Sequence, residues 1–552
     1  MPFYKRPTFT SLLTVVSCAV LLYSCGSGKQ TGGGMGIFSG DFVNEEAFAT
    51  AISSRLKPVD TKDSAFQANL LKDIELNTAY AYQLSGNKAI WFDEDGLKKS
   101  AVDFSAQIKE LAAEGIGEQY NVKRLDDILK QANGENIATD TLVNWDIALT
   151  QMYLTAAKDL LLGNKEIKVK DEQWFAANDS SFNGATILAK VMGTESKFPS
   201  FDSFRPEHKY YEQMRADAGE WQLLAKDSAY NALRQQWKNN KTPLLAAQII
   251  KKEMPGVAFA TDDSTDEQAA AIKSYQYYRQ LKPSGKLDTA TLALLNLQPA
   301  TYIDKLQLNM ERVRRLPRQI GNEYVWVNIP LMELDYMRDD VNKFHSRVVV
   351  GKVSRQTPSL VAKMTNIVFN PPWGVPPTIL KNDVGPGVSR SGSGYLARKG
   401  LRAYDSKGND VTGSVNGSNY KRFSYRQPPG AHNSLGEVKF NLPNKWDIYI
   451  HDTPHRENFG SRMRALSSGC VRVQNPKDFA EIILEDRKYN RSKIDSVIET
   501  RKTKHEKLDR DVQVYIVYMT VAPDSTGTRM RYLNDVYKRD IPVAAKNTIA
   551  AK

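Results

Sequence analysis

The residues best placed to do chemistry are a cysteine and a histidine in the last third of the chain. An apolar, β-branched run at residues 448–450 leads into His451, and a turn of small residues at 467–469 presents Cys470. A free cysteine has a pKa of about 8.5 and is mostly protonated at neutral pH, so a nucleophilic cysteine needs a neighbouring base. We therefore expect Cys470 to attack an acyl group, with His451 holding its proton, to form a thioester.

Two neighbouring features support this interpretation. A tight turn such as 468–470 can direct successive backbone N–H groups at one point, where they stabilise the oxyanion of a tetrahedral intermediate. Arg472 adds a planar guanidinium that suits a substrate carboxylate. Two of the six histidines, His451 and His455, fall in this one loop. The alternative is a buried structural cysteine, which is a common role for an isolated Cys.

The region around these residues is predicted to be mostly β. Five runs rich in β-branched and aromatic residues are bounded by Pro, Gly and Asn, at 324–329, 347–350, 366–369, 446–450 and 512–518. One helix is expected at 475–484, with Asn475 as N-cap and Pro476 in the first turn. The glycine-rich segment 383–430 interrupts the strands, and we expect a lid or a binding loop there, with a disordered insertion as the alternative.

Everything before residue 301 is predicted to be helical or unstructured. Residues 41–245 show helical periodicity, clearest in Leu142, Trp145 and Leu149 and also found near 97–114, 123–132 and 207–238. This part carries no catalytic pattern and is interpreted as a helical scaffold. Residues 246–300 contain two short helices around a turn. The expected fold class is α+β multidomain, with helices first and a mostly-β domain last.

The N-terminus has the pattern of an export signal. Basic residues precede a short apolar stretch, and residues 22–25 read Leu-Tyr-Ser-Cys. This resembles a bacterial lipobox, which predicts a lipoprotein signal peptide over residues 1–25, cut so that the lipidated Cys25 becomes the first residue of the mature chain; an ordinary cleaved signal peptide is the alternative. Residues 26–40 are expected to form a flexible tether, and 541–552 a tail. Of the three cysteines, only Cys470 would then remain a free thiol.

Composition narrows the class without choosing a function. The chain has 552 residues, 41% hydrophobic and 25% charged, which excludes wholesale disorder, collagen and a polytopic membrane protein. Its net charge of +12 suits an anionic polymer or membrane surface. Nucleic-acid binding is disfavoured, because the basic residues are dispersed and the chain is expected to be exported. The histidines and cysteines form no metal-binding spacing, so we expect no metal and no cofactor.

Residues 301–540 resemble the YkuD-type catalytic domain of the L,D-transpeptidases, in the large subfamily with a helical scaffold and a peptidoglycan-binding module ahead of it. The matching phrases occur in order along the domain, at residues 308–312, 327–330, 355–358, 369–376, 394–396, 427–436, 449–454 and 468–472. Residues 272–297 likewise resemble the small helical peptidoglycan-binding module, with a plain helical hairpin as the alternative. The chain departs from the widespread family signature at Ser468, where other members have histidine.

The resemblance implies specific roles for the site residues. Cys470 would be the nucleophile and His451 the base, with the backbone carbonyl of Asp452 orienting the imidazole and the N–H groups of Gly469 and Cys470 forming the oxyanion hole. The residues implied in substrate binding under the 383–430 lid are Arg472, Tyr449, Trp373, Ser468, Asn433 and Tyr395. Core packing is the alternative for Trp373 and Tyr449, and a turn role for Asn433.

The implied activity is formation of 3→3 crosslinks between peptidoglycan tetrapeptide stems, with release of D-Ala. The same acyl-enzyme could serve an L,D-carboxypeptidase, a D-amino acid exchange enzyme or an enzyme that attaches a protein. A non-catalytic wall-binding lipoprotein is an alternative of another class. Carbapenem-type β-lactams are implied as inhibitors that acylate Cys470. The expected location is the periplasm of a Gram-negative bacterium, with a lipid anchor in the outer membrane.

Overall fold

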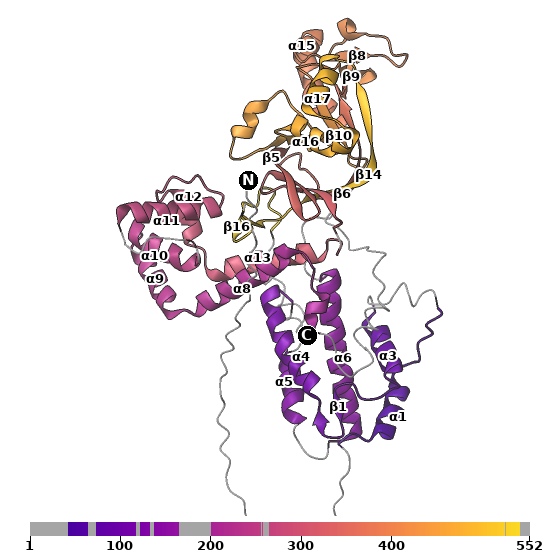
Figure 1. Cartoon of the computed structure of the whole chain (residues 1–552), viewed down its shortest axis with the longest axis vertical. Helices are drawn as coiled ribbons and strands as arrows, with labels where there is room; N and C mark the ends of the chain where they lie inside the picture. Colours follow the sequence, from indigo (N-terminus) through magenta and orange to yellow (C-terminus); the bar gives the residue numbers. More distant parts are fainter. Residues whose placement is uncertain are drawn as a thin grey trace, which may run out of the picture. The chain divides into compact units, whose positions relative to one another are not determined.

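The computed structural model describes residues 42–63, 73–116, 122–132, 137–164, 200–255, 257, 264–318, 320–524 and 526–540 (Figure 1). The chain divides into two compact units, and all of these residues belong to the second, Phe42–Lys552. Cys25 and the segments predicted as signal peptide, tether and tail lie outside the described residues. In the described part, no helix is long and apolar enough to span a membrane.

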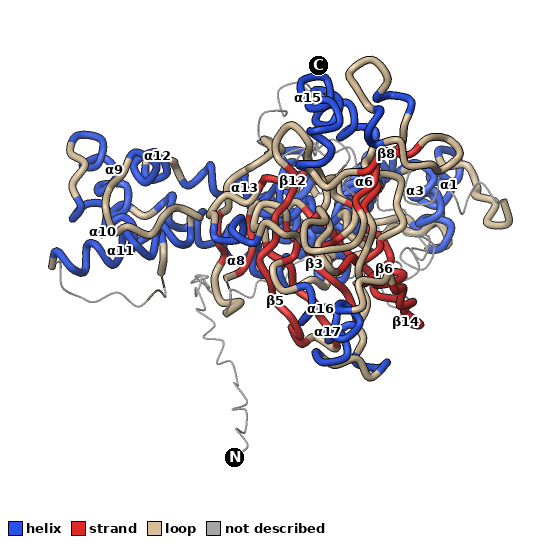
Figure 2. The backbone as a smooth tube through the Cα atoms, turned by 90° about the horizontal axis from the view of Figure 1, so that it is seen from above, coloured by secondary structure: helices blue, strands red, loops and turns tan. Residues whose placement is uncertain are grey.

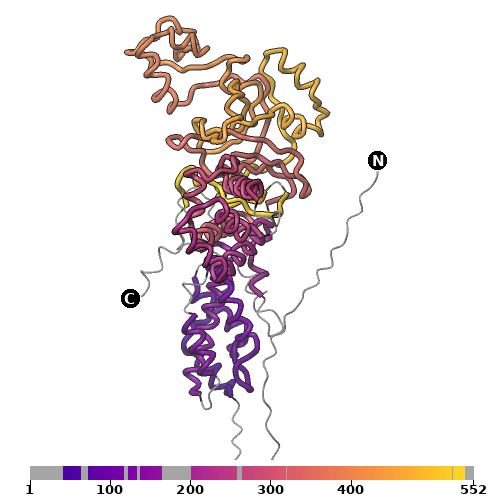
Figure 3. Tube along the Cα trace, turned by 90° about the vertical axis from the view of Figure 1, so that its left-hand side faces the viewer, coloured from indigo at the N-terminus to yellow at the C-terminus, as the bar shows by residue number. Residues whose placement is uncertain are grey.

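The first helices pack around a core of aromatic and aliphatic side chains, and Figure 3 shows several of them running side by side. They are α1 (Glu45–Arg55), α3 (Ile74–Leu84), α4 (Lys99–Glu110), η1 (Leu111–Glu114), α5 (Val122–Gln131), α6 (Thr139–Leu162) and η2 (Phe201–Phe204), with a small hairpin of β1 (Phe92–Asp93) and β2 (Gly96–Leu97). The periodicity predicts α6 correctly, and Gly163 follows its last residue with a positive φ of 74°.

A second group of helices leads towards the catalytic region. It comprises α8 (Lys209–Lys226), α9 (Ser228–Asn239), α10 (Pro243–Glu253), α11 (Thr265–Tyr278), α12 (Thr289–Leu295) and α13 (Pro299–Arg314). The helical stretch predicted near 207–238 comprises two helices, because the Asp227 carboxylate accepts bonds from the N–H groups of Ala229 and Tyr230 and so caps α9. Between α11 and α12, the buried Gln276 amide donates to Lys286 O and Thr291 Oγ1 at 2.9 and 2.8 Å, which fixes the turn.

The catalytic region is built on one mixed sheet of nine strands in the order β12-β5-β13-β11-β10-β6-β14-β3-β4. The strands are β3 (Glu323–Asn328), β4 (Glu333–Arg338), β5 (Val341–Gly351), β6 (Leu360–Phe369), β10 (Val438–Asn441), β11 (Ile450–His451), β12 (Ala465–Ser467), β13 (Val471–Val473) and β14 (Lys504–Val517). Because β4 also pairs with β5, the sheet closes on itself. This closed sheet surrounds an apolar core.

Two helices lie beside this sheet, as Figure 2 shows: α16 (Pro476–Ile483) and α17 (Arg491–Glu499). Phe479 of α16 packs against the rings of Phe344 and Phe440, with centroids 5.0 and 4.6 Å away. The α16 prediction is correct to within a residue at each end. The remaining short elements are η6 (Arg456–Gly460), η7 (Glu485–Arg487) and the hairpin of β15 (Val521–Pro523) and β16 (Met530–Tyr532).

The strand expected at 446–450 is mostly wrong, since only Ile450 belongs to β11. Residues 444–448 form a turn instead. The Asn444 side-chain oxygen accepts bonds from the N–H groups of Trp446 and Ile448, at 3.0 and 3.2 Å. A side chain that hydrogen-bonds nearby backbone competes with the sheet for the same donors.

The segment 383–430 is folded. It belongs to a small subdomain of α14 (Pro377–Ile379), the π-helix η3 (Leu380–Val384), α15 (Gly385–Arg398), η4 (Thr412–Ser414), η5 (Tyr420–Arg422) and a sheet of β7 (Trp373–Gly374), β9 (Ser424–Gln427) and β8 (Arg402–Tyr404). The subdomain has its own apolar core, which includes Val388, Leu396 and Tyr425. The helical N-terminal half and the mostly-β C-terminal domain confirm the predicted α+β class.

Candidate active site

The register of two parallel strands gathers the predicted catalytic residues. Ile450 of β11 pairs with Val471 of β13, and His451 pairs with Arg472. Ile450 and Val471 are fully buried in the core. Successive side chains of a strand point to opposite faces, so His451, Arg472 and the preceding Cys470 share the other face. They line one cleft of about 1900 Å³.

Cys470 is presented by a turn that its own neighbours close. The Ser467 hydroxyl accepts a bond from the Gly469 N–H at 3.1 Å and donates to the Cys470 carbonyl at 2.6 Å. Gly469 has a φ of 125°, a conformation that favours glycine, and a Cβ there would lie 3.2 Å from Ile448 Cδ1. Of the two predicted oxyanion donors, the Gly469 N–H is therefore hydrogen-bonded within the turn. The Cys470 N–H is not, and it remains available as a donor.

His451 is buried and oriented by backbone. Its Nδ1 lies 2.5 Å from the carbonyl oxygen of Asp452. A carbonyl can only accept, so Nδ1 carries the hydrogen and Nε2 keeps its lone pair in the neutral ring. The pKa of His451 is lowered to about 3, mainly by burial and further by the positive charges of Arg472 and Lys439, while the bond to Asp452 opposes this shift. At neutral pH the ring is thus an uncharged base.

The Asp452 side chain is occupied elsewhere and holds that backbone in place. Its carboxylate accepts bonds from the N–H groups of Glu437 and Thr453, at 2.8 and 2.6 Å. It also pairs with the Arg456 guanidinium at 2.6 Å. The carbonyl that orients His451 is therefore anchored from three sides.

Two of the cations that line the cleft, Lys439 and Arg472, act on the thiol. Arg472 was predicted from the sequence, whereas Lys439 of β10 was not. Lys439 pairs with His451 across the strands, and its Nζ lies 4.1 Å from the centroid of the Tyr449 ring. Burial raises the pKa of the Cys470 thiol, and hydrogen bonding by Tyr449 and the charges of Lys439 and Arg472 oppose that rise. The alternation of Lys439 with the buried Val438 and Phe440 is the sequence signal that could have revealed it.

The remaining predicted residues divide between the cleft and its support. Trp373, Tyr449, Tyr395 and Ser468 line the cleft. Asn433 does not: it is buried, and its amide donates to the carbonyls of Pro371, Gln427 and Pro428 at 2.9–3.3 Å. The structure therefore gives Asn433 the turn role that was its alternative.

An ion pair connects the subdomain to the nucleophile turn. Arg355 Nη2 donates to Asp383 Oδ1 at 3.0 Å, and Arg355 Nη1 donates to the Ser468 hydroxyl at 3.0 Å. The departure from the family signature at Ser468 thus falls where the subdomain contacts the turn. No group of three or more His, Cys, Asp or Glu side chains in the described ranges could hold a metal ion.

Comparisons with known proteins agree with this geometry. The model of the L,D-transpeptidase catalytic domain, YkuD, matches residues 322–503, and the model of a scaffold domain matches residues 77–217. A Haemophilus influenzae protein named as a candidate L,D-transpeptidase is 36% identical over 219 residues, which are 39% of this chain and 44% of that protein. The match thus spans less than half of the relative's length.

A solved structure, the Ldtfm-avibactam carbamoyl enzyme, aligns with 36% of this chain and 49% of its own at 12% identity. Its TM-score is 0.19, too low to support a structural argument. The two domain models and the curated relative confirm the resemblance seen in the sequence. This chain carries a YkuD-type L,D-transpeptidase catalytic domain behind an N-terminal scaffold domain.

Proposed function

We propose that the chain is a peptidoglycan L,D-transpeptidase that forms 3→3 crosslinks through a thioester on Cys470. The observation that supports the proposal is the strand register that brings Cys470 and a neutral, backbone-oriented His451 to the same face of the sheet, where both line one cleft. A nucleophile next to an oriented base is the arrangement that covalent acyl transfer requires.

The first half of the reaction forms the thioester. His451 Nε2 takes the proton of the Cys470 thiol, and the sulfur attacks the carbonyl between the diamino acid at position three and the terminal D-Ala of a tetrapeptide stem. The Cys470 N–H stabilises the resulting oxyanion. When the intermediate collapses, the C–N bond breaks, His451 returns the proton to the leaving amine, and D-Ala departs.

The second half transfers the acyl group. The side-chain amine of a diamino acid on a neighbouring stem attacks the thioester carbonyl and gives a proton to His451. Collapse of this intermediate breaks the C–S bond, and the proton returns to the sulfur. The new amide joins two third-position residues, and Cys470 is regenerated.

The cleft has the polarity that such a substrate needs. Stem peptides carry carboxylates, and Arg472 and Lys439 supply positive charge on the cysteine's face of the sheet. Trp373, Tyr395 and Tyr449 add aromatic walls. The folded segment 383–430 would limit the access of water, which competes with the amine for the thioester.

The acceptor is the open choice, because water, a free D-amino acid or a lysine of another protein could also resolve the thioester. Incubation with a disaccharide-tetrapeptide and analysis of the products by mass spectrometry tests the proposal. We expect a crosslinked dimer that has lost one D-Ala. Tripeptide stems without dimer would instead identify a carboxypeptidase. No change at all would favour the non-catalytic wall-binding alternative.

The cellular setting follows as part of the proposal. The lipobox-like residues 22–25 support export and lipidation at Cys25, with the enzyme held in the periplasm at the outer membrane of a Gram-negative bacterium. Carbapenem-type β-lactams are expected to acylate Cys470. Globomycin-sensitive processing of the precursor would test the anchor, and a mass adduct on Cys470 after carbapenem treatment would test the inhibitor.

A further inference from the structure

The carbonyl of Gly469 is held by a residue far away in the sequence. Thr357 Oγ1 donates to Gly469 O at 2.7 Å and accepts a bond from the Gly351 N–H at 2.8 Å. In a trans peptide the C=O and the following N–H point in opposite directions. Since the Gly469 carbonyl points at Thr357, the Cys470 N–H points away from it, and Cys470 itself lines the cleft.

This N–H is the one that the proposed reaction needs. The Gly469 N–H is bonded to Ser467 Oγ, whereas the Cys470 N–H donates to none of the described residues. An oxyanion donor must be held in place before the negative charge develops, because reorienting it during the reaction would cost free energy. The bond from Thr357 performs this function for the Gly469–Cys470 peptide.

Thr357 is itself fixed by the end of the chain. It is fully buried, and its N–H donates to the hydroxyl of Tyr537 at 3.2 Å. The same hydroxyl donates to Gly351 O at 2.5 Å. The turn between Gly351 and Thr357 is so tight that a Cβ on Gly351 would lie 2.3 Å from Arg355 O. Tyr537 thus joins both ends of the turn that carries Thr357.

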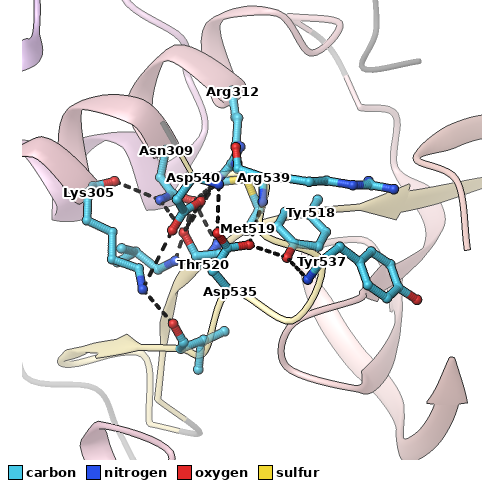
Figure 4. A network of polar contacts seen from close by, with 12 residues as sticks. Lys305, Asn309, Arg312, Tyr518, Met519, Thr520, Asp535, Tyr537, Arg539 and Asp540 are labelled. Carbon is cyan, nitrogen blue, oxygen red and sulfur yellow. Dashed lines mark hydrogen bonds and ion pairs between the residues drawn. The ribbon is translucent and has the colours of Figure 1, made fainter. Parts of the chain in front are cut away.

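Tyr537 is anchored in turn by the network shown in Figure 4. Its N–H donates to Tyr518 OH at 2.7 Å, and the two rings stack with centroids 5.6 Å apart. A few residues further on, Asp540 pairs with Arg312 of α13 at 2.8 Å. Arg312 is completely buried. The segment 535–540 therefore lies beyond the matched catalytic domain but is bound firmly to it.

We propose that Thr357, braced by Tyr537, is a positioning residue that directs the Cys470 N–H into the oxyanion hole, and that the C-terminal segment 535–540 is consequently part of the catalytic machinery. The inference rests on the proposed function in that Cys470 is the residue acylated. It does not depend on which acceptor resolves the thioester.

Two reactions of the same thiol separate this role from a purely structural one. Acetylation by p-nitrophenyl acetate passes through a tetrahedral oxyanion, whereas alkylation by iodoacetamide displaces iodide at carbon and forms none. In the full chain, Thr357→Val should slow acetylation of Cys470 about 100-fold, comparable to loss of an oxyanion donor, and leave alkylation within about twofold. Thr357→Ser keeps the hydroxyl and should restore acetylation. Tyr537→Phe should slow acetylation about tenfold.

Tyr489→Phe is the matched control, because it removes a buried hydroxyl that donates to Glu506 outside the cleft. Acetylation at the normal rate in both Thr357→Val and Tyr537→Phe would overturn the inference, as would a parallel loss of alkylation. If Thr357→Val does not fold, the ratio of the acetylation rate to the alkylation rate in Tyr537→Phe tests the inference instead. Normal acetylation of Cys470 in the wild-type chain without any crosslinking of stems would count against the proposed function but not against this inference.

Discussion

At the scale of single residues, the site keeps its histidine neutral, while the charges of Lys439 and Arg472 act on the thiol. Burial lowers the pKa of His451 to about 3, so an imidazolium is not available at neutral pH to stabilise a thiolate. That charge must come from Lys439 and Arg472, which line the same cleft. In the proposed mechanism His451 would therefore move the proton, and the two cations would stabilise the anion.

Replacement of Lys439 tests this division. Lys439→Met should raise the pKa of the Cys470 thiol, because a positive charge near the thiolate is lost. The profile of the alkylation rate of Cys470 by iodoacetamide against pH should therefore move to higher pH. Lys439→Arg should keep the original profile.

Lys445→Met is the control, because Lys445 also lies over an aromatic ring, 4.6 Å from the centroid of Trp446, but outside the lining of the cleft. An unchanged profile in Lys439→Met, or the same change in Lys445→Met, would show that Lys439 does not stabilise the thiolate.

Burial of His451 also predicts how stability depends on pH. In the unfolded chain His451 is protonated below about pH 6.5, whereas in the folded chain it stays neutral down to about pH 3. Stability should therefore fall as the pH is lowered through this range, by about 2 kcal/mol between pH 7 and pH 5 from this residue. His451→Gln should lose less stability over that interval than the wild type, as measured by urea unfolding, whereas replacement of the exposed His505 should make no difference.

At the scale of elements, the short strands β11 and β13 hold the predicted site residues, and the subdomain lines the same cleft. The sequence was enough to predict that Cys470 and His451 lie in one site, because a strand ending on His451 and a small-residue turn before Cys470 are local patterns. Lys439 was missed because its strand reads as an ordinary alternation of buried and exposed residues. Two other features join segments that are far apart in the sequence, so no local sequence pattern predicts them. They are the closure of the sheet by β4 and β5 and the bond from Thr357 to Gly469.

The ion pair of Arg355 and Asp383 should control how well the subdomain excludes water. Asp383→Ala removes the partner of Arg355 and should increase the fraction of thioester lost to hydrolysis several-fold, with little effect on stability, because the pair is partly exposed. The ratio of tripeptide to crosslinked dimer measures this partition. Asp410→Ala, which breaks a pair with Arg402 inside the subdomain, is the control. An unchanged ratio in Asp383→Ala would contradict the role of this contact.

At the scale of the whole molecule, buried charges join the helical part to the catalytic region. Glu114 accepts bonds from Arg205 Nη2 and the Tyr211 hydroxyl at 2.6 and 2.5 Å. Tyr211 in turn accepts a bond from Arg314 of α13 at 2.8 Å. Helix α13 also meets the C-terminal segment through Arg312 and Asp540. The scaffold and the nucleophile turn are thus connected through one helix.

Removal of Glu114 should therefore be costly. Glu114→Ala leaves the buried Arg205 guanidinium with only the exposed Asp202 as an ion-pair partner, and breaking a buried pair in this way destabilises a protein by about 3 kcal/mol. Replacement of the exposed Asp140, which pairs with Arg55, should cost well under 1 kcal/mol. Thermal unfolding of both variants measures the difference. Equal melting temperatures would show that the Glu114 cluster does not stabilise this junction.

The central claim is that Cys470 carries the acyl group. The most direct measurement is intact-mass analysis of the full chain, quenched in acid during turnover of a disaccharide-tetrapeptide, followed by peptide mapping. We predict an adduct with the mass of the substrate less D-Ala, located on Cys470 and absent in Cys470→Ala. Crosslinking that persists in Cys470→Ala, or an acyl group found on another residue, would contradict the account.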